Sequence, residues 1–136
     1  MKDSALADQS LHFAVKILSL VRRLQKGGEH IVSKQVGRSG TSIGANIREA
    51  QFGSSRADFI SKMHIALKET NETGYWLELL QQTNEISKAE YAALMADCSS
   101  IRAMLVASIK TAKEKLEDEK KAAEGKPATE ENRDEL

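Results

Sequence analysis

The residues that could do chemistry in this sequence are one cysteine, three histidines and several glutamates, and their spacing fits no common metal site. A two-metal carboxylate site in a helical protein needs Glu-x-x-His pairs, and no glutamate here has a histidine three residues later. His12, His30 and His64 fall in three different predicted helices. Glu69 and Glu72 share a helix face, which favours a salt-bridging or interface role.

Two further features resemble catalytic or phosphate sites only superficially. Residues 37–44 are rich in glycine and serine, but they lack the Gly-Lys-Ser/Thr of a phosphate-binding loop and follow no predicted strand. Cys98 falls in an apolar helical stripe, and buried thiols are usually inert. The sequence therefore predicts a protein that is not an enzyme and that holds no cofactor and no metal.

Four segments with helical periodicity position these residues. They cover about residues 9–26, 30–52, 56–84 and from 88 onward; Gly27-Gly28 ends the first, Gly53-Ser54-Ser55 precedes the third, and Ser87 precedes the fourth. Ser55 with Asp58, and Ser87 with Glu90, have the spacing of capping boxes. We predict an all-α, antiparallel up-and-down four-helix bundle over residues 1–116. A frayed helix end and an acidic disordered tail are expected over residues 117–136.

Charge is distributed unevenly along the chain, although the net charge is zero. Residues 1–116 carry 16 Lys and Arg against 12 Asp and Glu, whereas residues 117–136 carry 4 against 8. Such asymmetry suggests a polyanionic partner, although an ordinary solvated surface remains an alternative. The candidate nucleic-acid-binding residues are the basic side chains of the first two predicted helices: Lys16, Arg22, Arg23, Lys26, Lys34, Arg38 and Arg48.

Three features suggest contact with another subunit. Apolar residues cover more than half the circumference of the first predicted helix, so more than the monomer core should cover it. Glycines 37, 40 and 44 lie together on one flank of the second, where each costs about 1 kcal/mol unless another backbone approaches closely. Trp76 fits either a core or an interface, and its position beside Glu69 and Glu72 favours the interface. The candidate subunit-interface residues are Gly37, Gly40, Gly44, Glu69, Glu72 and Trp76. Arg102 either reaches water or pairs with a carboxylate.

Several stretches of the sequence resemble a known family. The most specific is RSGTSIGANIREA at residues 38–50, and SRADFISKM at 55–63, IALKE at 65–69 and SIKTAK at 108–113 follow in order. The chain resembles the bacterial four-helix-bundle proteins encoded in intervening sequences of 23S ribosomal RNA genes, over roughly residues 10–116. The resemblance implies assembly into a ring, typically a homopentamer. A related family, the accessory variability determinants of diversity-generating retroelements, binds nucleic acid through a basic surface and works beside a reverse transcriptase.

The resulting hypothesis is a non-enzymatic, homo-oligomeric protein that binds RNA or DNA and assists a reverse transcriptase or a ribosomal RNA-associated element. The alternative is a protein-binding scaffold without a nucleic-acid role. We expect a cytoplasmic location and no membrane partner, because the first ten residues lack the apolar core of a signal peptide and the single cysteine excludes an internal disulfide.

Overall fold

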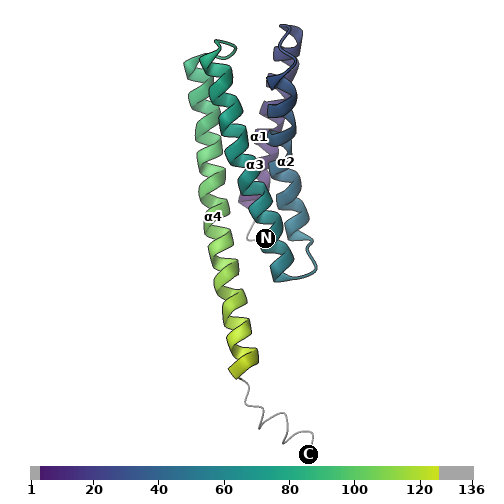
Figure 1. The fold of residues 1–136 in the computed structure, drawn as a ribbon, viewed down its shortest axis with the longest axis vertical. Helices are drawn as coiled ribbons and strands as arrows, with labels where there is room; N and C mark the ends of the chain where they lie inside the picture. The colour runs from purple at the N-terminus through teal and green to yellow at the C-terminus, as the bar shows by residue number, and fades with distance from the viewer. Residues whose placement is uncertain (1–3, 126–136) are drawn as a thin grey trace, which may run out of the picture.

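The chain folds into four antiparallel α-helices joined by short turns (Figure 1). The structure is a computed structural model that describes residues 4–125. The helices are α1 (Ser4–Lys26), α2 (Val32–Gln51), α3 (Arg56–Gln82) and α4 (Lys88–Gly125). This confirms the predicted all-α fold, and within residues 4–125 no strand occurs.

Local signals place the helix ends. Ser55 Oγ accepts a hydrogen bond from the Asp58 N–H at 3.0 Å, and Ser87 Oγ accepts one from the Glu90 N–H at 3.1 Å, which confirms both predicted caps. Helices α1 and α3 end in left-handed residues, Gly28 with φ 91° and Asn84 with φ 61°. The residue after each left-handed position donates its N–H to the carbonyl oxygen five residues earlier, as in a Schellman motif.

Each helix contacts its two neighbours in the order α1, α2, α3, α4 and back to α1, which is the connectivity of an up-and-down bundle. Aliphatic side chains fill the interior; the largest fully buried ones include Ile17, Ile43, Leu77, Leu80 and Ile101. The α1–α4 contact is less extensive than the other three. That side of the bundle is therefore the least covered by the chain's own helices.

Helix α4 continues beyond the other three helices (Figure 1). Its last two to three turns contact the bundle through Arg56, whose Nη2 lies 2.7 Å from Glu119 Oε1. Residues 117–125 are helical, and the rest of the predicted acidic tail, residues 126–136, lies outside the described residues.

By length and composition alone, helix α4 could cross a membrane. It contains an 18-residue window of mean hydropathy 1.4, of which 28% is buried inside the fold. Core helices of proteins in water pass the same test, and α4 packs its apolar stripe against α3. The expectation of no membrane partner stays a prediction.

Candidate nucleic-acid and subunit interfaces

Three of the seven predicted nucleic-acid-binding residues form ion pairs within the chain. Lys16 Nζ lies 2.8 Å from Asp97 Oδ2, and Arg23 Nη2 lies 2.5 Å from Glu90 Oε1, so both link α1 to α4. Arg38 pairs with two glutamates of α3. Because each of these cations has a carboxylate beside it, a phosphate would have to compete for it.

The other four predicted cations, Arg22, Lys26, Lys34 and Arg48, are exposed and form no ion pair with any residue in the described range. Arg22, Lys26 and Lys34 lie around the turn between α1 and α2, where α1 ends and α2 begins. Arg48 lies in the last turn of α2, at the opposite end of that helix. The structure therefore divides the predicted basic surface into a cluster of three and one separate arginine.

Glu29, the acidic residue of this basic region, caps helix α2. Its Oε1 accepts hydrogen bonds from the N–H groups of Val32 at 2.9 Å and Ile31 at 3.2 Å, and its Oε2 accepts one from Ser33 at 2.7 Å. Partial burial raises the pKa of Glu29, but these three donors outweigh it and hold that pKa below its ordinary value. The carboxylate is thus engaged with the backbone, and no hydrogen bond or ion pair within residues 4–125 joins it to a neighbouring cation.

A polar cluster joins the middle of α2 to α3. Arg38 Nη1 donates to Glu69 Oε2 at 3.0 Å, and Arg38 Nη2 donates to Glu72 Oε2. Glu72 Oε2 also accepts the indole N–H of Trp76 at 2.9 Å. Beside Arg38 in α2, Ser39 Oγ accepts a hydrogen bond from the buried Thr73 hydroxyl of α3 at 2.8 Å.

The interface prediction for Glu69, Glu72 and Trp76 stays a prediction. All three find partners inside their own chain, and Trp76 is half-buried with its ring against Tyr75, centroids 5.0 Å apart. These intrachain partners could not be predicted from the sequence, because the same side chains suit a subunit contact and a helix–helix contact.

The predicted close approach at the glycine flank exists, but it also lies within the chain. A Cβ added at Gly40 would lie 2.9 Å from both γ carbons of Ile17, and one at Gly44 would lie 3.2 Å from Ser10 Oγ. Gly37 similarly faces Val21 at 3.1 Å. The neighbouring backbone is therefore α1, and the prediction that these glycines contact another subunit stays a prediction.

The wide apolar arc of α1 leaves a stripe uncovered. Leu11, Val15 and Leu18 are 53%, 60% and 42% exposed. Their spacing places them on one face of α1, and Val15 shares a groove with Ala93 of α4. Large exposed apolar patches mark interaction sites in many proteins. The expectation that more than the monomer core covers α1 stays a prediction.

The remaining candidates for chemistry or binding are Cys98, the possible metal ligands and Arg102. Burial, and to a smaller extent Asp97, raises the pKa of the Cys98 thiol to about 12. Within residues 4–125, no group of three His, Cys, Asp or Glu side chains is placed to hold a metal ion. Arg102 is exposed, and its Nε donates to Asn71 Oδ1 at 3.1 Å, so its partner is an amide and not a carboxylate.

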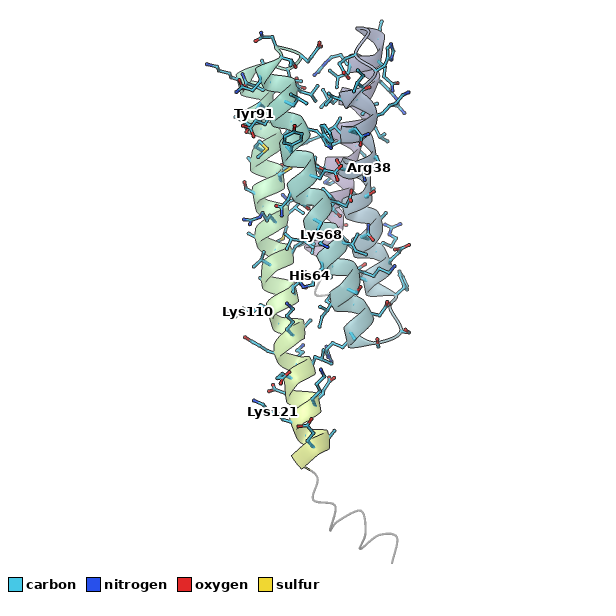
Figure 2. The ribbon with its side chains drawn as sticks, viewed as in Figure 1. Arg38, His64, Lys68, Tyr91, Lys110 and Lys121 are labelled. Atoms are coloured by element: carbon cyan, nitrogen blue, oxygen red, sulfur yellow. The ribbon has the colours of Figure 1, made fainter. Side chains whose placement is uncertain are left out.

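A second group of basic residues was missed by sequence reasoning. His64 of α3 lines one groove with Lys110 and Lys113 of α4 (Figure 2), and Lys68 lies one turn from His64 along α3. These residues are far apart in the sequence. The periodicity of the two helices predicts their apolar stripes but not which basic residues lie together. Only the α3–α4 packing brings the four together.

The comparisons with known proteins agree with this architecture. The family model of the 23S rRNA-intervening sequence protein matches residues 2–107. The chain belongs to the 23S rRNA-intervening sequence protein family. A crystal structure from Bacteroides thetaiotaomicron VPI-5482, described as a protein with unknown function from the S23 ribosomal protein family, is 52% identical to this chain and superposes with a TM-score of 0.79. That match covers 81% of this chain and 99% of the other. No curated protein matches the chain.

Membership of the 23S rRNA-intervening sequence protein family accounts for the bundle but brings no function with it. The family match ends at residue 107, within α4. The end of α4 and the acidic residues that follow it therefore lie outside the part of the chain that defines the family.

Proposed function

We propose that this chain is a non-enzymatic, cytoplasmic accessory protein that assembles into a homo-oligomer, a pentameric ring, and binds RNA or DNA. The observation that carries the proposal is the cluster of exposed cations, Arg22, Lys26 and Lys34, which have no carboxylate partner among the described residues. Phosphate contacts from such side chains position a polyanion without reading its sequence.

The exposed stripe of α1 supports assembly. Val15 lines a groove between α1 and α4, whereas Leu11 lines a groove between α1 and α2. Burying this stripe against a second copy would remove apolar surface from water, at about 25 cal/mol per Å². Several copies in one assembly would also multiply a weak three-cation patch, since each further phosphate contact becomes intramolecular.

Assembly is tested by the mass of the purified chain in light scattering. The proposal expects a mass several times 15.0 kDa. Leu11→Glu with Leu18→Glu should reduce the mass to that of a monomer while helical circular dichroism stays unchanged, because both side chains are exposed in the single chain. A monomeric mass for the unmodified chain would contradict the assembly.

Nucleic-acid binding is tested by mobility shift with single-stranded RNA and double-stranded DNA at low salt. The variant Arg22→Glu, Lys26→Glu, Lys34→Glu should lose binding, and binding by the unmodified chain should weaken steeply as salt is raised. The matched control is Lys115→Glu, Lys120→Glu, Lys121→Glu, which makes the same charge change on the exposed end of α4. Equal loss in both variants would show a general charge effect, and no loss in either would refute the phosphate contacts.

The partner we propose is a reverse transcriptase or a ribosomal RNA-associated element, and the neighbouring reading frames of the gene are the direct check. The exposed α1 stripe equally favours a second candidate function, a protein-binding scaffold without nucleic acid. A chain that stays monomeric, binds no nucleic acid, and loses capture of a co-encoded protein on Val15→Glu would support that scaffold.

A further inference from the structure

Helices α3 and α4 form an apolar groove on the face that carries the second group of cations. The groove encloses about 410 Å³, and its lining includes Leu67 of α3 with Val106 and Ile109 of α4. Val106 is 46% exposed, whereas Ile109 is 5% exposed, so the floor is closed and one wall is open to water. His64 and Lys110 border the groove from opposite helices (Figure 2).

The rim of this groove carries more basic than acidic side chains. Lys110 and Lys113 line it, and Lys68 lies one turn from His64 on the same face of α3. None of these lysines forms an ion pair with a residue in the range 4–125. Glu114 contributes one carboxylate to the lining, at the end of the groove nearest Gly125. An acidic segment with an apolar residue is the occupant that such a surface fits.

We propose that residues 126–136 of the same chain fold back along α4 and dock on this groove through their carboxylates. Residues 126–136, KPATEENRDEL, carry four acidic side chains against one lysine and one arginine, and they include Leu136. The α4 helix rises about 1.5 Å per residue, which places Lys113 about 18 Å and Lys110 about 22 Å from Gly125. Eleven extended residues span up to about 36 Å, so the segment reaches both lysines without unwinding α4.

In this proposal the docked segment has two effects on the α3–α4 face. Its carboxylates neutralise Lys110 and Lys113, and its leucine covers Val106. It also keeps a polyanion away from the α3–α4 face, so that the cations around the α1–α2 turn remain the ones open to phosphate. A second copy of the bundle is a poorer occupant for this groove, because it would bring the same lysines to the contact.

The test uses the full chain with Asn132→Cys carrying a nitroxide spin label. Cys98 does not compete for the label, because it is buried and the pKa of its thiol is about 12. The methyl resonances of Leu67, Val106 and Ile109 should lose most of their intensity through paramagnetic broadening. Those of Leu24, near the α1–α2 turn, should keep theirs. Raising the salt to about 1 M, where the screening length is about 3 Å, should restore the groove signals.

Charge reversal separates docking on the groove from a general attraction to α4. Lys110→Glu with Lys113→Glu should abolish the broadening, and adding Glu130→Lys with Glu131→Lys should bring it back. Lys120→Glu with Lys121→Glu is the matched control, with the same charge change nearer to the segment, and it should leave the broadening intact.

Three results would overturn the proposal. One is full intensity of the groove methyl groups in the labelled chain. The second is equal loss of broadening in the Lys110/Lys113 and the Lys120/Lys121 variants. The third is broadening that disappears when labelled protein is diluted into unlabelled protein, which would mean docking on a neighbouring copy. None of these results depends on whether the chain binds nucleic acid.

Discussion

Gly40 and Gly74 allow a matched test of whether the α1–α2 contact, and not helix propensity, determines the glycines of this bundle. Both glycines lie inside long helices. A methyl group at Gly40 would lie 2.9 Å from Cγ1 and Cγ2 of the fully buried Ile17. One at Gly74 would meet the flexible end of Met95 at 3.5 Å, an ordinary contact. Alanine should therefore have opposite effects at the two positions.

The magnitudes follow from two opposing terms. Replacing an interior helical glycine by alanine gains about 1 kcal/mol in helix propensity. Carbon atoms pack best at about 3.5–4.0 Å, so Gly40→Ala must move Ile17 or separate the helices, and overpacking of this kind costs about 3 kcal/mol at its upper end. Gly40→Ala should thus lower the free energy of unfolding by about 2 kcal/mol. Gly74→Ala should raise it by about 1 kcal/mol.

The assay is urea unfolding followed by helical circular dichroism, repeated at two protein concentrations because self-association would add to the apparent stability. In an Ile17→Ala background the two contacts at 2.9 Å disappear and the one with Cβ at 3.3 Å remains, so the loss caused by Gly40→Ala should there shrink or turn into a gain of up to about 1 kcal/mol. Gly40→Ala that is as stable as the unmodified chain would refute the close approach of α1. Equal effects of Gly40→Ala with and without Ile17 would refute Ile17 as its cause.

Three further predictions concern charged or titratable groups. Because the pKa of Glu29 is lowered in the folded state, its stabilisation is present above its ordinary value of 4.5 and is lost as pH falls through the folded value; Glu29→Gln should cost about 0.5–2 kcal/mol at pH 7, and a difference from the unmodified chain that persists at pH 2.5 would contradict this. Arg38→Gln should cost about 1 kcal/mol in urea unfolding, since its pairs with Glu69 and Glu72 are partly exposed, and the loss should shrink in 0.5 M salt, an approximate condition chosen for strong screening. Cys98 should react with a disulfide reagent at pH 7.5 about a thousandfold more slowly in the folded chain than in urea, from a thiol pKa of about 12 against 9.0; similar rates in both states would show that the thiol is accessible.

The helices could be predicted from the sequence because their ends depend on neighbouring residues. Ser55 and Ser87 cap the helices that follow them, and Gly28 supplies the left-handed residue that ends α1. Each signal acts over about one turn, so the sequence contains it entirely. The start of α1 at Ser4, earlier than expected, is the exception, since that turn is held by tertiary contacts of Leu6, which is 4% exposed, and of the partly buried Ala7.

The ion pairs could not be predicted because they depend on how each helix is rotated against its neighbour. Lys16 and Asp97 are 81 positions apart in the sequence, and Arg23 and Glu90 are 67 apart. A basic segment in the sequence therefore predicts a basic surface only when the carboxylates of the packed helices are known. The seven cations of residues 9–48 illustrate this, because α3 and α4 supply partners to three of them.

The most specific family segment, residues 38–50, encodes the packing of α2 and not a ligand site. Ser39, Gly40, Ile43, Ile47 and Ala50 are all buried. The hydroxyl and carboxylate partners that its polar residues meet come from α3, as with Ser39 and Arg38. The buried positions of this segment identify the fold, whereas its exposed positions, such as Arg48, are free to carry function. Differences in function among chains of this fold should therefore lie in residues such as Arg22, Lys34 and Lys110, which the packing does not constrain.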